Sequence, residues 1–147
     1  MINRLQAVFA SLHRHDVKYV VIGGIAAIIH GVPRATFDLD ILIEPTCDNA
    51  KRLLSALQEA ELGTAFQIDA AELLANEITV FQDRVRIDVQ TSTPGLLFED
   101  AWGSKETIHY QGQDLYVVSR ANLISAKRAS GRHVDLEDIA ILEDSES

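Results

Sequence analysis

Apolar residues recur at helical spacing near the start of the chain and predict an amphipathic helix over about residues 2–15. The short, β-branched run at residues 19–22 has the composition of a buried strand. This strand leads directly into Gly23-Gly24, after which residues 25–29 suit a short helix. A glycine and a proline soon afterwards end that helix. The start of the chain therefore predicts helix, strand and short helix in that order.

Alternating apolar and polar residues predict further strands. Residues 37–43 alternate in this way, and the proline that follows separates them from a leucine-rich helix. Residues 78–81 and 84–89 flank Gln82-Asp83 and predict an antiparallel hairpin with a tight turn at those two residues. The remaining expected elements are a short helix capped by Asp69, strands at 107–110 and 115–118, and helices at about 120–130 and 135–142.

This order of elements predicts one α+β domain over residues 1–147, with a mixed β-sheet flanked by helices. A chain of this length fits a single compact core. The sequence contains no internal repeat, low-complexity tract or linker. The C-terminal helices, from about residue 119, are therefore expected to pack on the same domain.

Composition narrows the class of protein. No segment reaches the roughly 20 apolar residues that span a bilayer, and the N-terminus lacks the features of a secretory signal. The single cysteine, Cys47, cannot build a disulfide framework. These observations favour a cytoplasmic protein with no membrane partner. The net charge of -9 argues against broad, non-specific binding to nucleic acid, although several basic residues between Arg120 and Arg132 form a local exception.

Three carboxylates carry the candidate chemistry. Side chains at positions i and i+2 of a strand share a face, so Asp38 and Asp40 project together, while Phe37 and the apolar residues that alternate with it point to the other side. In the predicted hairpin, Asp88 lies on the polar face of its strand and is the natural third member. Such crowding is relieved by a divalent cation that prefers oxygen ligands, such as Mg²⁺ or Mn²⁺. We therefore expect Asp38, Asp40 and Asp88 to bind metal and to be catalytic.

The stretch from Gly23-Gly24 through His30-Gly31, followed by Arg34-Ala-Thr-Phe-Asp-Leu-Asp40, resembles the signature of the nucleotidyltransferase superfamily. More narrowly, it is similar to small bacterial nucleotidyltransferases related to abortive-infection and toxin–antitoxin systems. A later segment with Lys127 and Asp135 is similar to the C-terminal Lys and Asp motif of that group. The resemblance covers roughly residues 19 to 142 and implies a nucleotidyltransferase (DNA polymerase beta-like) fold.

The resemblance also implies roles for individual residues. Asp38 and Asp40 would bind two metal ions, and Asp88 would bind the catalytic one and help to activate the acceptor hydroxyl. Gly23 and Gly24 would hold the nucleotide phosphates, although Gly24 stands where many superfamily members have a serine.

Three further residues, apart from Asp38, Asp40 and Asp88, have candidate roles in binding the nucleotide. Arg34 suits contact with a phosphate or, equally, neutralisation of the acidic pair. The resemblance implies that Lys127 contacts the triphosphate and that Asp135 orients Lys127 or the acceptor. From its spacing alone, Lys127 fits an ordinary amphipathic helix.

The function that follows is metal-dependent transfer of a nucleoside monophosphate from a nucleoside triphosphate, such as ATP, to a hydroxyl of RNA, protein or a small molecule. The alternative is a non-catalytic, nucleotide-binding partner or regulator in a toxin–antitoxin-type pair. The sequence leaves open the acceptor, the nucleotide preference, and whether the chain acts alone, as a homo-oligomer or with a toxin–antitoxin partner.

Overall fold

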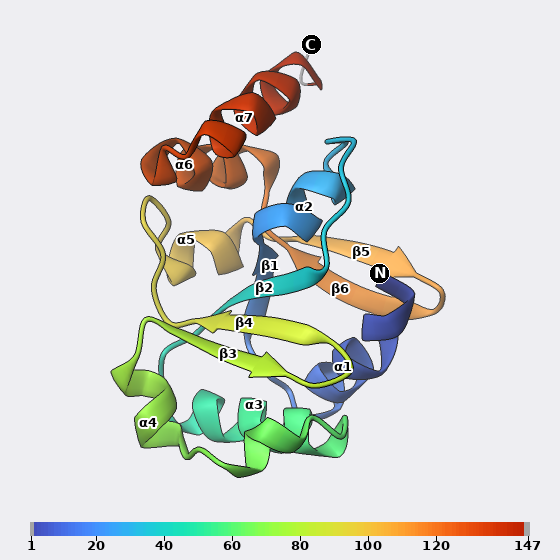
Figure 1. Cartoon of the computed structure of the whole chain (residues 1–147), viewed down its shortest axis with the longest axis vertical. Helices are drawn as coiled ribbons and strands as arrows, with labels where there is room; N and C mark the ends of the chain where they lie inside the picture. Colours follow the sequence, from blue (N-terminus) through green and yellow to red (C-terminus); the bar gives the residue numbers. More distant parts are fainter. Residues whose placement is uncertain (1, 146–147) are drawn as a thin grey trace.

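The computed structural model describes residues 2–145, so residues 1, 146 and 147 of the predicted domain lie outside it. Helices and strands follow one another in the predicted order (Figure 1). In chain order they are α1 (Ile2–Arg14), β1 (Tyr19–Ile22), α2 (Gly23–Ile29), β2 (Asp38–Ile43), α3 (Cys47–Glu59), the 3-10 helix η1 (Gly63–Phe66), α4 (Ala70–Ala75), β3 (Ile78–Gln82), β4 (Arg86–Gln90), α5 (Phe98–Gly103), β5 (Glu106–Tyr110), β6 (Gln113–Val117), α6 (Arg120–Ser130) and α7 (His133–Ser145).

The strands form one mixed sheet in the order β3-β4-β2-β1-β6-β5. Strands β1 and β2 are antiparallel and place Ile22 opposite Asp40, whereas β2 and β4 are parallel and place Asp40 opposite Asp88. The hairpins β3–β4 and β5–β6 form the two ends of the sheet. The predicted α+β class, with a mixed sheet flanked by helices, is confirmed.

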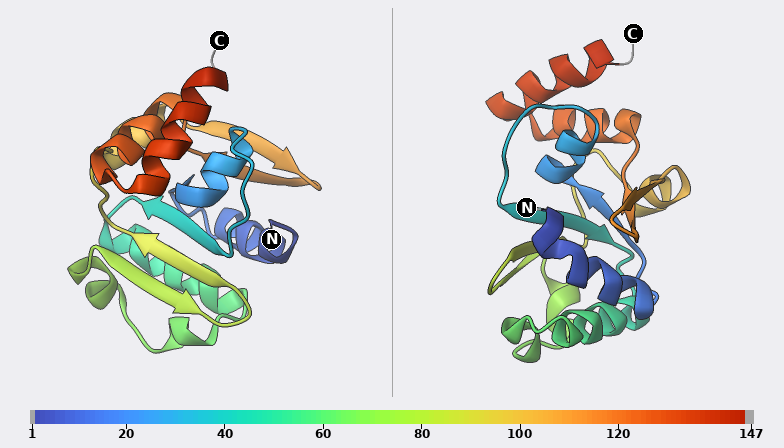
Figure 2. Two further views of the ribbon diagram at one scale, coloured as in Figure 1. Left: turned by 45° about the horizontal axis from the view of Figure 1, so that its top comes forward. Right: turned by 90° about the vertical axis from the view of Figure 1, so that its right-hand side faces the viewer.

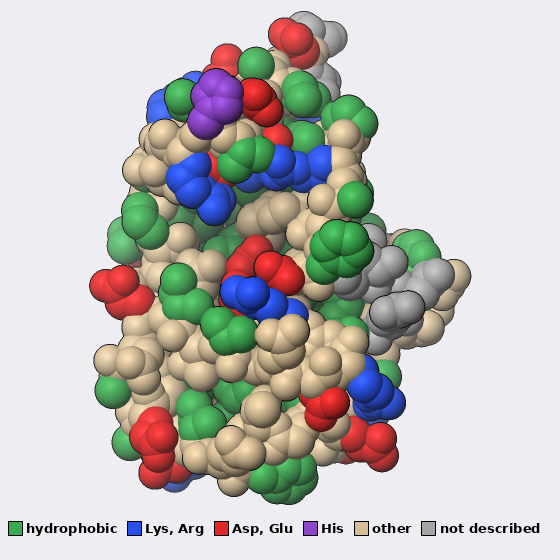
Figure 3. Space-filling model, in the orientation of Figure 1, with side chains coloured by type: hydrophobic (Ala, Val, Ile, Leu, Met, Phe, Trp, Pro, Cys, Tyr) green, Lys and Arg blue, Asp and Glu red, His purple; other side chains and the backbone are tan. Residues whose placement is uncertain are grey.

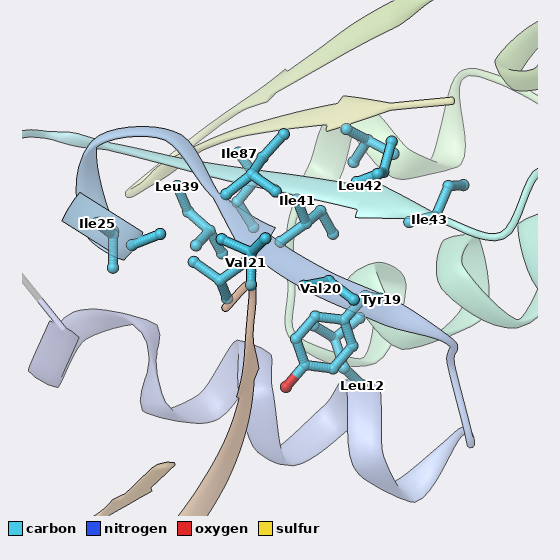
Figure 4. Packing of buried hydrophobic residues seen from close by; sticks show 14 of the residues in the cluster. Leu12, Tyr19, Val20, Val21, Ile25, Leu39, Ile41, Leu42, Ile43 and Ile87 are labelled. Atoms are coloured by element: carbon cyan, nitrogen blue, oxygen red, sulfur yellow. The ribbon is translucent and has the colours of Figure 1, made fainter. Parts of the chain in front are cut away.

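Helices cover both faces of the sheet, with α1 and α3 on one side and α2, α6 and α7 on the other (Figure 2). The side toward α1 is apolar, and Figure 4 shows Leu12 of that helix beside Tyr19 of β1. Leu39, Ile41 and Ile87 are fully buried. Each such side chain contributes about 1.5–3 kcal/mol by leaving water. Because side chains alternate, the residues between them face the opposite side, where the three aspartates lie.

Two local predictions about strands are wrong. Phe37 was expected to join the buried face of its strand, but β2 begins at Asp38 and the Phe37 side chain is 80% exposed. The ladder between β2 and β4 starts at the pair Asp38 and Arg86, so Phe37 has no strand partner. The turn of the β3–β4 hairpin spans residues 83–85 instead of Gln82-Asp83, because Gln82 pairs with Arg86. There the Asp83 carboxylate accepts a hydrogen bond from the backbone of Gly63, a tertiary contact that local pattern does not contain.

The helices of residues 2–145 include none that combines the length and the apolar composition needed to cross a membrane.

A buried amide joins β1, β2 and α3. The side chain of Asn49 is fully buried, and its Oδ1 accepts a hydrogen bond of 2.8 Å from the backbone N–H of Lys18. Its Nδ2 donates to the carbonyl oxygens of Lys18 and Glu44, at 3.0 and 2.9 Å. The carbonyl oxygen of Lys18 also accepts a hydrogen bond of 3.3 Å from the backbone N–H of Glu44, so Asn49 adds to the backbone pairing where the two strands begin and end.

We predict that Asn49→Ala lowers the free energy of unfolding by about 2–4 kcal/mol, because it removes three hydrogen bonds made by a fully buried side chain. Urea denaturation monitored by circular dichroism measures the change. The matched control is Asn76→Ala, since the exposed Asn76 amide makes one hydrogen bond to the carbonyl of Glu72. The control should cost less than about 1 kcal/mol. Equal losses in the two variants would contradict the role assigned to Asn49.

Candidate active site

Neighbouring strands bring the three predicted carboxylates to one cleft. Asp38 and Asp40 project from β2, and Asp88 projects from the adjacent parallel strand β4. Because Asp40 and Asp88 are opposite each other in the ladder, their side chains share a face. All three line a cleft with a volume of about 480 Å³.

The sheet forms the floor of this cleft, and α6 with the start of α7 forms one wall. Figure 3 shows acidic and basic side chains gathered in a hollow over β2 and β4, with more basic side chains toward α6 and α7. Residues Thr93 and Pro94 line the cleft beside α6. The next residue, Gly95, has φ +77°, and a Cβ there would lie 2.8 Å from the carbonyl oxygen of Ser125. Glycine at this position lets the loop approach the helix closely.

The ionised form of Asp40 is unfavourable in the folded protein. Burial raises its pKa to about 7, and the nearby negative charges of Asp88 and Asp38 add to the effect. Arg132 lowers this pKa without offsetting the other causes. A carboxyl in such a position is stabilised either by a proton or by a cation.

Arg86 supplies positive charge within the carboxylate group. Its Nε and Nη2 donate to the two carboxylate oxygens of Asp88, at 2.9 and 3.3 Å. The same Nε lies 3.8 Å from Oδ2 of Asp38. The hydrogen bond to Asp88 is the main reason that the pKa of Arg86 rises above its ordinary value. Arg86 thus binds the carboxylates that were predicted to bind metal.

The arrangement offers only oxygen donors to a cation, as Mg²⁺ prefers. Among residues 2–145, however, no group of three or more His, Cys, Asp or Glu side chains stands ready to enclose a metal ion. Asp88 directs both of its oxygens toward Arg86. The three aspartates therefore share a cleft without forming a closed ligand set.

The two glycines have different surroundings. Gly23 lines the cleft and has φ +68°, and a Cβ built on it would overlap the carboxylate of Asp40. This contact follows from the sheet, because the preceding residue, Ile22, pairs with Asp40. A Cβ on Gly24 would instead lie 3.2 Å from the hydroxyl of Thr36. The structure therefore places Gly23 beside the carboxylates, while Gly24 packs against the loop before β2.

A buried ionic network lies behind the cleft and joins α6, α7 and the loop before β2. The Nζ of Lys127 is 2.9 Å from Asp138 and 3.4 Å from Asp135, and all three side chains are buried. Asp138 also accepts a hydrogen bond of 2.9 Å from Arg34. Arg132 donates two hydrogen bonds to Asp135. Burial raises the pKa of Asp135, but the hydrogen bonds from Arg132 and Ser130 and the charges of Arg132 and Lys127 together lower it below its usual value.

This network gives partners to two residues whose roles the sequence left open. Arg34 pairs with Asp138 in α7, whereas neutralisation of Asp38 and Asp40 was one of its two candidate roles. Lys127 lines the cleft, yet its ammonium group is held by two carboxylates. Sequence analysis assigned no role to Arg86, which pairs with Asp88 in the cleft. Its spacing of two residues from Asp88 did place both side chains on one face of the strand.

The fold and the clustered carboxylates define a protein of the nucleotidyltransferase class. The chain belongs to the family described as "Nucleotidyltransferase of unknown function (DUF6036)", whose model matches residues 2–143. This family and the observed sheet confirm the predicted resemblance and the predicted fold. No curated protein sequence matches the chain significantly.

Solved structures support the same fold. A crystal structure of a "putative nucleotidyltransferase" from Thermotoga maritima superposes with a TM-score of 0.64 at 15% identity, covering 97% of this chain and 92% of that one. An antigenic nucleotidyltransferase-like protein from Paracoccidioides brasiliensis gives a TM-score of 0.57 at 17% identity, covering 94% of this chain and 72% of that one. At these identities the likeness concerns the fold alone.

We predict that Asp40→Asn changes the pH dependence of stability in metal-free buffer. The folded protein keeps the Asp40 proton up to a pH of about 7, whereas an unfolded aspartate loses it near its ordinary pKa of 3.8. Asp40 therefore stabilises the fold fully below that ordinary pKa, and this contribution is lost as the pH rises toward 7. Asp40→Asn should flatten this part of the curve and be more stable than wild type at pH 8, by about 1–3 kcal/mol.

Urea denaturation in EDTA, at pH values from about 4 to 8.5 in steps of ~0.5 unit, measures the free energy of unfolding of both proteins against pH. The control is Asp48→Asn, because Asp48 is exposed in the first turn of α3. It should reproduce the wild-type curve. Parallel curves for wild type and Asp40→Asn would show that Asp40 is not stressed in the folded protein.

Proposed function

We propose that the chain transfers a nucleoside monophosphate from a nucleoside triphosphate to an acceptor hydroxyl, with release of pyrophosphate, and that the reaction depends on Mg²⁺ or Mn²⁺. The observation that carries this proposal is the cleft of a nucleotidyltransferase-family chain into which Asp38, Asp40 and Asp88 project from adjacent strands. Charge accumulates on phosphoryl oxygens during such a transfer, so positioning and electrostatics supply most of the catalysis.

The residues fit a divalent cation by the chemistry of their donors. Three carboxylates are brought to one cleft, and the pKa of Asp40 is raised by burial and further by the negative charges of Asp88 and Asp38. Asp38, Asp40 and Asp88 would hold the metal once Arg86 gives way. When bound, the metal would neutralise phosphate charge and lower the pKa of an attacking hydroxyl.

The chain itself would orient the substrate. Gly23 lets the Asp40 carboxylate lie directly against the backbone, because a Cβ at position 23 would overlap it, and so it would keep Asp40 in place at the cleft. Arg132 is 70% exposed and lines the cleft with Lys127, so both extend the positive charge available to a triphosphate. Asp135 would keep these two cations in place. Arg34 would affect the site indirectly, because its partner Asp138 also pairs with Lys127.

Acceptor choice is the open part of the proposal. RNA, protein and small-molecule hydroxyls all suit the chemistry, and the net charge of -9 disfavours an acceptor bound mainly through an extended phosphate backbone. Each of the four labelled triphosphates should therefore be incubated with the protein, metal and either RNA or lysate. The species that acquires label identifies the acceptor. The rival function, a non-catalytic nucleotide-binding partner of a toxin–antitoxin pair, gives bound nucleotide without labelled product.

We predict that Mg²⁺ or Mn²⁺ raises the melting temperature of the wild-type protein, and raises it further with a non-hydrolysable triphosphate. At a metal concentration 100 times the dissociation constant, the shift should be about 5–10 °C. Asp38→Asn should abolish the shift and reduce nucleotide transfer by about 100-fold or more.

Asp48→Asn removes the same charge outside the cleft and controls for net charge, with all samples at one ionic strength. Differential scanning fluorimetry gives the shifts. If Asp38→Asn and wild type respond equally to metal, the acidic residues do not form the metal site.

We also predict that Gly23→Ala is far more damaging to transfer than Gly24→Ala. An alanine at position 23 must adopt a positive φ and displace the Asp40 carboxylate, whereas one at position 24 meets only the Thr36 side chain. Transfer should fall about 100-fold in Gly23→Ala and less than about tenfold in Gly24→Ala. Melting temperatures of both variants establish that each is folded at the assay temperature. Comparable activity in the two variants would remove Gly23 from the site.

A further inference from the structure

Arg86 occupies the carboxylates that the proposed function reserves for a metal ion. Its guanidinium binds Asp88 through two nitrogens, at 2.9 and 3.3 Å, and reaches Asp38 at 3.8 Å. The sheet fixes this arrangement, because Arg86 lies opposite Asp38 in the parallel ladder and two residues before Asp88 on the same face. A planar guanidinium that binds both oxygens of one carboxylate leaves few lone pairs for another cation.

This ion pair differs from the buried network behind the cleft. The side chain of Arg86 is 40% exposed, whereas that of Lys127 is 6% exposed. Moving Lys127 away would take a buried ammonium group from both of its carboxylate partners, which is strongly unfavourable. Arg86 projects from the sheet at the floor of the cleft and is partly exposed to water, so it can release Asp88 without becoming a buried, unpaired charge. It is therefore a displaceable cation, while Lys127 is a fixed one.

A metal ion and Arg86 compete for the same oxygen atoms. Any divalent ion that enters the cleft in the absence of nucleotide must first free Asp88 and Asp38, so its apparent affinity is reduced by the small fraction of protein in which Arg86 is released. A metal bound to a triphosphate brings its own anionic oxygens. A guanidinium is well suited to bind them, and Arg86 lines the same cleft.

We propose that Arg86 is a positioning residue that exchanges partners. In the nucleotide-free protein it neutralises Asp88 and Asp38 and keeps free metal out. When the metal enters with a triphosphate, Arg86 releases the carboxylates to the metal and pairs with a phosphate oxygen. The cleft then selects the metal–nucleotide complex over the free ion. This inference rests on the proposed metal-dependent function.

The competing explanation is that Arg86 is a permanent electrostatic brace, which keeps its contact with Asp88 whether or not metal is bound. A brace strengthens the site, so its loss should weaken binding of free metal or leave it unchanged. Partner exchange predicts the reverse. Loss of Arg86 should tighten the binding of free metal and weaken the binding of the metal–triphosphate complex.

The experiment compares wild type, Arg86→Gln and Arg86→Lys, with Arg132→Gln as a charge-matched control. Arg132 lines the same cleft but donates its hydrogen bonds to Asp135. Isothermal titration with Mn²⁺ alone gives the affinity for free metal, and titration with a non-hydrolysable triphosphate in excess Mg²⁺ gives the affinity for the complex. Melting temperatures establish that each variant is folded before titration.

We expect the dissociation constant for Mn²⁺ alone to fall about tenfold in Arg86→Gln, as when the competent fraction rises from a tenth to nearly all of the protein. The constant for the metal–triphosphate complex should rise by about tenfold or more. Arg86→Lys keeps the charge but not the two-pronged contact, so both changes should be smaller. Arg132→Gln should change the Mn²⁺ affinity clearly less than Arg86→Gln.

Three outcomes would overturn the inference. Unchanged or weaker Mn²⁺ binding in Arg86→Gln would make Arg86 a brace. Equal tightening in Arg86→Gln and Arg132→Gln would reduce the effect to general charge. Unchanged binding of the metal–triphosphate complex would show that Arg86 does not pass to a phosphate. In each case metal still binds the wild-type protein, so the proposed function survives. Failure of every variant to bind metal or nucleotide would instead refute the proposed function and the inference together.

Discussion

The crowding of like charges between two neighbouring strands is the constraint on which the rest of the site depends. Asp40 lies opposite Asp88 in the ladder, and Asp38 lies two residues before Asp40 on the same face. Burial, together with this arrangement, makes ionisation of Asp40 unfavourable, and positive charge in the cleft relieves it. Arg86 at the floor and Arg132 at the wall supply part of that charge. The proposed metal would supply the remainder, so the reason for binding a cation is present in the resting protein.

Sequence alone was sufficient for the features that depend on local periodicity. The alternation around Asp38 and Asp40, and again around Asp88, placed the aspartates on polar strand faces before any tertiary arrangement was known. The motif from Gly23 to Asp40 resembled a known superfamily, and the family of the chain agrees with it. Such signals survive because they arise from side chains within one element or from elements adjacent in the chain.

Sequence was insufficient wherever a residue's partner comes from a distant element. Arg34 pairs with Asp138, which lies 104 positions later in the chain, so local pattern gave no reason to prefer it to the nearby aspartates. Phe37 is apolar and alternates correctly, but the ladder that would bury it begins one residue later. Arg86 was visible on its strand face, yet its two-pronged contact with Asp88 depends on side-chain geometry within the cleft. The type of a residue limits which partners it can have, but it does not identify the partner that it has in the fold.

The parallel pairing of β2 with β4 also has a kinetic consequence. Asp40 and Asp88 meet only after the intervening segment, with α3, α4 and β3, has been laid down, and Val21 of β1 pairs with Val117 near the other end of the chain. Contacts between residues so far apart in sequence form slowly, because a long loop must close before they contribute stability. Helices and hairpins form from neighbouring residues, so they can precede this step. We therefore expect Asp40 and Asp88 to meet late in folding, so that an incompletely folded chain lacks the repulsion between these two carboxylates.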